Sequence, residues 1–238
     1  MSNFMHYKLL DACGEEGCPV CRLERYYVER HLENQFYENV NSPNWRDKLR
    51  GSLGFCREHT WMAVNQRLGD PLGFSIIYRD VLKSILDKLE RGTSQQSSSH
   101  HRSARRHRGS EQARTVMENL TNAITPVGQC PVCVYRQETT RAILAELAKG
   151  LDETDLVKAL QLSDGLCLPH LQQFLTEIKD STTSEKLFAI QRGKMEGLKA
   201  ELEEFIRKSD YREIQAGFGR EGDAWLRTVS LVAGGRKG

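Results

Sequence analysis

The 238-residue chain lacks any long hydrophobic run. No apolar stretch approaches the roughly 20 residues that a membrane-spanning helix needs. Residues 1–8 also lack the basic and then apolar pattern of a secretory signal. With 39% hydrophobic and 28% charged residues, the composition is typical of a soluble globular protein rather than a membrane or disordered one. We therefore expect a cytoplasmic protein with no membrane partner.

The sequence also lacks the motifs of common enzyme classes, since it has no P-loop, no HExxH and no GxSxG. Covalent haem attachment needs CxxCH, but Arg22 and Val134 follow the two CxxC pairs. Residues 217–222 match GxGxxG without a preceding strand pattern, so we interpret them as a glycine-rich loop between helices. No catalytic residue and no substrate is predicted, which favours a protein that is not an enzyme.

Positive charge is scarce outside one segment. The formal net charge is +2, and residues 93–114 contain five Arg but only one Glu. Within this segment, residues 93–110 are rich in His, Arg and Ser and contain no apolar residue larger than Ala, which predicts a flexible basic linker. Because the linker has no aromatic side chain for base stacking, nucleic acid is an improbable partner that only this linker would contact. A protein partner is the expectation.

Cysteine is abundant for a reducing compartment, where stable disulfides are rare. Six of the seven cysteines fall into a pattern that occurs twice: a CPxC pair followed by a CxxH pair, with 34 intervening residues in the first copy and 33 in the second. A Ser-x-Gly also precedes each CxxH. The eight residues of the pattern are Cys18, Cys21, Cys56, His59, Cys130, Cys133, Cys167 and His170. We interpret the repeat as a duplication with a period of about 111 residues.

Thiolates and imidazole are the usual ligands of zinc, and CxxC and CxxH have the spacing of structural zinc sites. Pro19 and Pro131 stiffen the CxxC turns, while Gly54 and Gly165 are placed to adopt positive φ and turn the chain toward each CxxH. The eight residues therefore predict two zinc ions, each with three Cys and one His. Four protein ligands leave no open position, so the sites are expected to be structural.

The spacing leaves the pairing of the motifs open. The simpler arrangement places Cys18 and Cys21 with Cys56 and His59, since each set is complete within its own repeat. The alternative joins Cys18 and Cys21 to the distant CxxH of the second repeat. Iron–sulfur clusters and dithiol redox chemistry are alternatives to zinc, and they would make the chain a redox or electron-transfer protein. The seventh cysteine, Cys13, is either a spare thiol or a substitute ligand.

Apolar residues recur with helical period throughout, and no convincing alternating strand is present. One stripe after Cys21 consists of Val28, Leu32, Phe36 and Val40, and a long amphipathic helix is expected around residues 184–207. The predicted fold class is all-α, with two helical lobes related by duplication, each built around one metal site. The lobes span residues 1–92 and 111–238, and residues 93–110 join them.

The doubled CPxC…CxxH pattern resembles a family of uncharacterised bacterial proteins that carry these motifs in a helical context. The stretch from Gly222 to Arg227, followed by Leu231–Gly234, is similar to the C-terminal part of that family. The resemblance covers most of the chain outside the linker. It implies that the eight ligand candidates belong together, but no reaction and no substrate. The predicted function is thus an interaction or regulatory module with two structural zinc sites.

Overall fold

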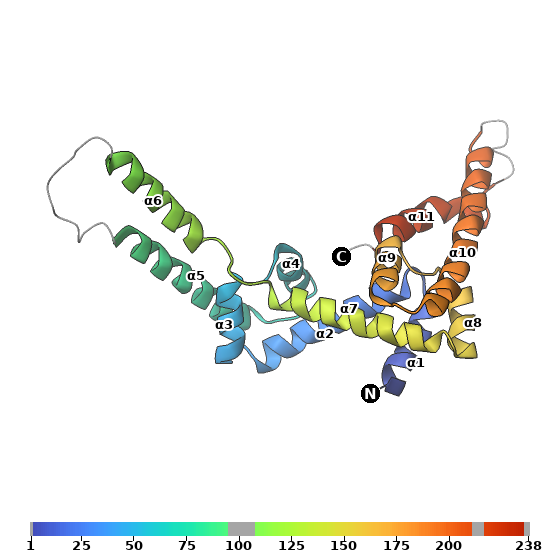
Figure 1. Cartoon of the computed structure of the whole chain (residues 1–238), viewed down its shortest axis with the longest axis horizontal. Helices are drawn as coiled ribbons and strands as arrows, with labels where there is room; N and C mark the ends of the chain where they lie inside the picture. The colour runs from blue at the N-terminus through green and yellow to red at the C-terminus, as the bar shows by residue number, and fades with distance from the viewer. Residues whose placement is uncertain (1, 95–107, 211–216, 236–238) are drawn as a thin grey trace. The chain divides into compact units, whose positions relative to one another are not determined.

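A computed structural model describes residues 2–94, 108–210 and 217–235 of the chain (Figure 1). These residues form helices and connecting turns and contain no strand, which confirms the all-helical prediction for this part of the chain. The helices are α1 (Ser2–Cys13), α2 (Pro19–Glu38), α3 (Pro43–Gly51), α4 (Arg57–Asn65), α5 (Pro71–Ser94), α6 (Arg108–Ala123), α7 (Pro131–Gly150), α8 (Thr154–Leu162), α9 (Leu168–Glu177), α10 (Ser181–Lys208), the short 3₁₀ helix η2 (Arg220–Asp223) and α11 (Ala224–Ala233).

The chain divides into two compact units. Unit 1 consists of residues 1–27 together with residues 136–238, and unit 2 consists of residues 28–135. These units differ from the expected lobes of residues 1–92 and 111–238. The difference arises because two long helices change unit along their length: Val20 of α2 lies in the core of unit 1, whereas Val28 lies in the core of unit 2. Similarly, Val132 of α7 is buried in unit 2 and Ile143 in unit 1.

The core of unit 1 is formed mainly by leucines from α7, α8 and α9, which pack against α1 and the first turns of α2. Ile143, Leu144, Leu147, Leu156 and Phe174 have no exposed surface. Helix α1 packs against α8, and α11 packs against α9 and α10. The long helix α10 contributes Leu187 and Gln191 to the buried side of the unit. Helix α1 had no counterpart in the expectations, since its sequence shows no clear apolar stripe.

The core of unit 2 is more aromatic. The stripe expected after Cys21 is confirmed for Val28, Leu32 and Phe36, which are buried on the second half of α2. The Phe36 ring contacts the rings of Phe55 and Phe74, and Trp45 contacts Phe55. Helix α5 packs against α3 and also against α6, which lies beside it and runs in the opposite direction (Figure 1).

Most of the predicted basic linker, residues 95–107, lies outside the described residues. At its two ends the helices extend further than expected, because α5 continues to Ser94 and α6 begins at Arg108. No helix among the described residues is both long enough and apolar enough to cross a membrane.

Candidate metal centres

The two CxxC motifs occupy the same position on two helices of equal length. Cys18 and Cys130 immediately precede α2 and α7, which begin at Pro19 and Pro131. Proline suits this position because the first turn of a helix leaves its N–H groups without intrahelical partners. The second cysteine of each motif follows in the first turn, so the tight helical start directs both sulfur atoms to one point.

The two CxxH motifs open shorter helices in a corresponding way. Cys56 and Cys167 are the N-cap residues of α4 and α9, with extended backbone dihedral angles. His59 and His170 lie in the first turn, three residues later, on the same side of the helix as the cysteine. The positive φ expected before each motif is confirmed, with φ of 95° at Gly54 and 78° at Gly165.

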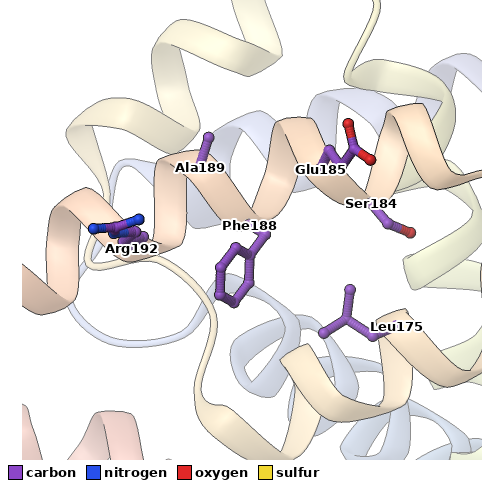
Figure 2. A pocket seen from close by; sticks show the side chains of 6 residues that line it. All are labelled: Leu175, Ser184, Glu185, Phe188, Ala189 and Arg192. Carbon is purple, nitrogen blue, oxygen red and sulfur yellow. The ribbon is translucent and has the colours of Figure 1, made fainter.

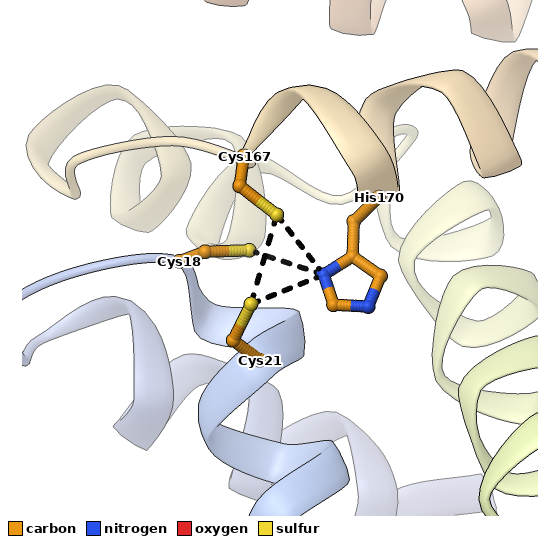
Figure 3. Close-up of side chains that lie close together, drawn as sticks. All are labelled: Cys18, Cys21, Cys167 and His170. Carbon is orange, nitrogen blue, oxygen red and sulfur yellow. Dashed lines mark hydrogen bonds between the residues drawn. The ribbon is translucent and has the colours of Figure 1, made fainter. Parts of the chain in front are cut away.

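In unit 1 the structure brings the first CxxC motif to the second CxxH motif (Figure 3). The Nδ1 atom of His170 lies 3.2 Å from Sγ of Cys167, 3.3 Å from Sγ of Cys21 and 3.7 Å from Sγ of Cys18. The sulfur atoms of Cys21 and Cys167 are 3.6 Å apart. We call these four residues the unit 1 cluster.

Unit 2 brings together the other two motifs with nearly the same geometry. The Nδ1 atom of His59 lies 3.2 Å from Sγ of Cys56, 3.4 Å from Sγ of Cys133 and 3.7 Å from Sγ of Cys130. The sulfur atoms of Cys133 and Cys56 are 3.5 Å apart. We call these four residues the unit 2 cluster.

All eight predicted residues thus lie in four-residue clusters, but the expectation that each repeat supplies a complete set is wrong. Each cluster takes its CxxC from one repeat and its CxxH from the other. The physical reason lies in the length of α2, whose 20 residues carry the chain about 30 Å away from Cys18. The nine-residue α3 that follows does not return the chain to its starting point.

The spacing of the ligand atoms fits a single tetrahedral ion. Around zinc, with Zn–S of about 2.3 Å and Zn–N of about 2.0–2.1 Å, sulfur atoms lie about 3.8 Å from each other and about 3.6 Å from the nitrogen. The observed separations of 3.2–3.7 Å agree with these values in both clusters. Cys18, Cys167 and His170 are buried in unit 1, as are Cys130 and His59 in unit 2. Each cluster offers four ligands to one buried point.

Burial sets the electrostatics of both clusters. It raises the pKa of the Cys133 thiol to about 12, and the neighbouring sulfur atoms of Cys130 and Cys56 add to the rise. Burial also raises the pKa of Cys18. Burial by itself would lower the pKa of His170. Hydrogen bonds to Cys167 and other neighbours outweigh this effect, so the pKa of His170 is raised to about 11. Three closely spaced sulfur atoms repel one another when ionised, and a divalent cation between them removes that repulsion.

A carboxylate that the sequence analysis did not single out orients the histidine of the unit 1 cluster. Oε2 of Glu24 lies 3.3 Å from Nε2 of His170 and accepts a hydrogen bond of 2.6 Å from the hydroxyl of Thr140. Burial raises the pKa of Glu24, but these two hydrogen bonds outweigh it and leave the pKa below its usual value. A carboxylate on the far nitrogen fixes the ring so that Nδ1 faces the sulfur atoms. In the sequence, the feature that could have indicated this role is the position of Glu24 three residues after Cys21, which is one helical turn along α2.

The end of α11 supplies another contact to the unit 1 cluster. The chain leaves this helix at Gly234, which has a φ of 89°, and the N–H of Gly235 donates a hydrogen bond of 3.3 Å to Sγ of Cys21. Positive φ at the residue after a helix is the usual role of glycine. The backbone N–H groups of such a turn stabilise negative charge on sulfur.

Cys13 belongs to neither cluster. It is buried in the core of unit 1, where burial raises the pKa of its thiol to about 11. A third group of ionisable residues consists of His6 on α1 with Glu153 and Asp155 at the start of α8. Both carboxylates are more than half exposed and lie 3.5 Å and 3.3 Å from Nε2 of His6, which is an ordinary surface contact between polar side chains.

Two further features lie apart from the clusters. The glycines of the GxGxxG match lie around η2, and no strand is present among the described residues before them. A shallow pocket elsewhere in unit 1 is mostly apolar (Figure 2). It is lined by Leu175, Ser184, Glu185, Phe188, Ala189 and Arg192. These side chains include no His, Cys or Lys, and the carboxylate of Glu185 is the one basic group beside Ser184.

The comparisons with known proteins give a family and a relative, but neither carries an assigned activity. Residues 4–237 match the model of a family of unknown function, DUF6062. The chain belongs to this family. It is also similar to an uncharacterised 23.9 kDa protein in the xynA 3′ region of Caldicellulosiruptor sp. (strain Rt8B.4). The two are 24% identical over 230 residues, which cover 95% of this chain and 99% of the relative. No solved structure matches.

Proposed function

We propose that this member of the DUF6062 family binds two zinc ions, one in each cluster, and that both ions are structural. The observation that supports this proposal is the convergence of four soft or borderline ligands on one buried point in each unit, at separations suited to one tetrahedral ion. With three thiolates and one neutral imidazole, each site carries a net charge of −1. All four positions are taken by the protein, so neither ion has an open position for water or substrate.

Each ion ties together distant parts of the chain. The unit 1 cluster joins Cys21 to Cys167, 146 residues apart, and the unit 2 cluster joins Cys56 to Cys133, 77 residues apart. A structural zinc ion contributes about 10–16 kcal/mol to folding. This exceeds the roughly 5–15 kcal/mol that stabilises a typical domain. The ions are therefore expected to determine whether the two units fold.

The matched motifs support an origin by duplication. Each repeat contains a 20-residue helix that begins at CPxC, two shorter helices of which the second begins at CxxH, and then a long helix. Because each cluster combines one motif from either repeat, we propose that the two copies evolved together as an interlocked pair. A biological role as an interaction or regulatory module in the cytoplasm accords with sites that hold the fold together and leave no place for a reaction.

Metal analysis tests the proposal. The protein is purified anaerobically without an affinity tag, and its zinc, iron and inorganic sulfide are measured per chain alongside the absorption spectrum. Two zinc ions per chain in a colourless protein are expected. Iron with sulfide and visible absorption would instead establish the redox or electron-transfer alternative. Metal-free protein with reactive thiols would refute metal binding altogether.

Cobalt substitution tests the ligand set. Co²⁺ replaces Zn²⁺ in tetrahedral thiolate sites and gives them visible absorption, so Cys21→Ser should remove half of the cobalt signal and Cys133→Ser the other half. Cys13→Ser is the matched control, because Cys13 is a buried cysteine outside both clusters. It should leave the metal content unchanged. Loss of metal on Cys13→Ser would mean that Cys13 is itself a ligand.

A further inference from the structure

The unit 2 cluster contains two partly exposed cysteines side by side. Cys56 and Cys133 are both partly exposed, whereas the third cysteine, Cys130, is only 7% exposed. The sulfur atoms of Cys56 and Cys133 lie 3.5 Å apart. Cys56 is the N-cap residue of α4 and Cys133 lies in the first turn of α7, so the two thiolates reach the cluster from separate helices. A small oxidant can therefore approach either cysteine from solvent and find the other within reach.

The corresponding pair of the unit 1 cluster is better protected. Cys21 is partly exposed, but its neighbour Cys167 is only 1% exposed. The chain that follows α11 also lies against Cys21, because the N–H of Gly235 donates a hydrogen bond of 3.3 Å to its sulfur atom. A group that stabilises the negative charge of a thiolate also lowers its nucleophilicity. The unit 1 cluster should therefore react with an oxidant more slowly than the unit 2 cluster.

We propose that hydrogen peroxide oxidises the unit 2 cluster before the unit 1 cluster, that it joins Cys56 to Cys133 by a disulfide bond, and that unit 2 thereby releases its zinc ion. This inference rests on the proposed zinc binding. The sulfur atoms of a disulfide lie about 2.05 Å apart, so this pair must approach by about 1.5 Å as the ion leaves. A shift of this size lies within the reach of side-chain rotation at the starts of α4 and α7.

The reaction is a two-electron oxidation in which peroxide is the acceptor. The thiolate of Cys56 or Cys133 attacks one oxygen of hydrogen peroxide, the O–O bond breaks, and a sulfenic acid and a hydroxide ion form. The other thiolate then attacks the sulfenic sulfur, forms the S–S bond and displaces a second hydroxide ion. Two protons from solvent convert the hydroxide ions to water. Only Cys130 and His59 remain as ligands, so the zinc ion dissociates.

The oxidation makes the unit 2 cluster a peroxide-sensitive switch. Unit 2 loses the ion that supports its fold, while unit 1 keeps its own ion. A thiol reductant that cleaves the disulfide regenerates both thiolates, which can bind zinc again. One chain thus combines a durable metal site with a reversible one.

Zinc release from the full-length, zinc-loaded protein tests the proposal. Hydrogen peroxide is added, and the released ion is measured with a chromogenic zinc indicator. Half of the bound zinc should leave in a fast phase and the other half in a slow one, and both ions should stay bound without peroxide. Gly235→Pro removes the donor to Cys21 and should accelerate only the slow phase. Gly235→Ala keeps the N–H, so it is the matched control and should accelerate this phase less.

Peptide mass analysis identifies the bond. Trypsin should release residues 51–57, which contain Cys56, and residues 115–136, which contain both Cys130 and Cys133. Protein sampled after the fast phase should give these two peptides linked to each other, and fragmentation should place the bond at Cys133. Dithiothreitol with added zinc should separate the peptides and restore the full metal content.

Several outcomes contradict the inference and leave the proposed zinc binding intact. These are a zinc-loaded protein that loses no ion to peroxide, a bond between Cys130 and Cys133 within one peptide, and oxidation of Cys21 and Cys167 before the unit 2 cluster. Sulfinic acid at Cys133, which dithiothreitol does not reverse, would equally overturn the proposed switch. A protein purified without zinc would refute the proposed function and this inference together, because there would be no ion to release.

Discussion

The two clusters have the same ligands and nearly the same distances, yet their surroundings differ. In the unit 1 cluster, Glu24 contacts the histidine and Gly235 donates to a sulfur atom. The loop before Cys167 is also held by Gln191, whose amide bonds both the N–H and the carbonyl of Leu166. In unit 2 the corresponding turn at Gly54 lies against the ring of Tyr78, whose hydroxyl pairs with that of Thr60. The turn before the CxxH motif is thus held by an amide side chain in unit 1 and by an aromatic ring in unit 2.

This difference shows that two sites can share the same four ligands while different neighbouring groups hold those ligands in place. The ligands determine which ion binds, while the surrounding groups set how firmly each ligand is oriented and how readily the ion leaves. The unit 1 cluster, with a carboxylate and an N–H donor directed at its ligands, is expected to release its ion more slowly than the unit 2 cluster. Competition of the metal-loaded protein with a chromogenic chelator should therefore give two phases.

Removal of a ligand should have the largest effect. Cys56→Ser is expected to abolish the ion of the unit 2 cluster, a loss of about 10–16 kcal/mol of folding free energy, and to unfold unit 2. Hydrogen exchange read by segment should show that residues around Cys130 and Cys133 lose protection, while those around Cys18 and Cys21 keep it. The opposite result would restore the pairing within each repeat. Cys167→Ser is the reciprocal variant and should expose the segment around Cys21.

Removal of the Glu24 carboxylate should have the next largest effect. Glu24→Gln removes the negative charge beside Nε2 of His170, which should weaken zinc binding in unit 1 by about 10- to 100-fold. The slow phase of chelator competition should accelerate and the fast phase should stay unchanged. Thr140→Val is a graded control, since it removes only the hydroxyl that supports Glu24. Unaltered kinetics in both variants would show that Glu24 does not tune this site.

Lowering the pH should destabilise unit 2 in particular, because His31 lies in that unit. Its ring stacks on Tyr135 with centroids 3.8 Å apart, and burial together with the charge of Lys48 lowers its pKa from 6.5 to about 4. The unfolded state therefore binds more protons than the folded state between these two values. Stability is fully present above pH 6.5 and falls as the pH drops toward 4.

This acid effect can be isolated by substitution. Unfolding of His31→Phe, which keeps the aromatic stack and cannot bind a proton, should show a smaller loss of stability over that pH range than the wild type. The difference between the two proteins at each pH removes the contribution of ligand protonation, which they share. Parallel pH profiles would mean that His31 accepts a proton without cost in the folded protein.

The smallest effect is expected from the N–H donor of Gly235. Gly235→Pro removes the hydrogen bond to Cys21, worth about 0.5–1.5 kcal/mol, and should speed zinc release from unit 1 by a few fold. Gly235→Ala is the matched control because it keeps the N–H, although its Cβ would lie 3.2 Å from Cβ of Cys21. Equal release rates in the two variants would assign the effect to crowding rather than to the hydrogen bond.

Much of the local structure could be predicted from the sequence. Val28, Leu32 and Phe36 of the apolar stripe after Cys21 and the positive φ of Gly54 and Gly165 agree with the structure, whereas Val40 lies beyond the end of α2. Each depends on residues within a turn or two of one another, so neighbouring side chains and backbone sterics suffice to determine it. Helix α1 was missed because its sequence shows no clear apolar stripe, and the role of Glu24 was missed because the side chains that it contacts lie more than 100 residues away.

What the sequence by itself determined is the identity of the eight ligand candidates and the geometry of each half-site, because two intervening residues and a helix start direct two donors to one point. What only the tertiary structure decided is which halves meet. The two spacings of 34 and 33 residues are nearly equal and the donors are identical in kind, so both pairings satisfy four-fold coordination. The choice follows from the 20-residue helices α2 and α7, whose apolar residues are buried in one core near the start and in the other further along.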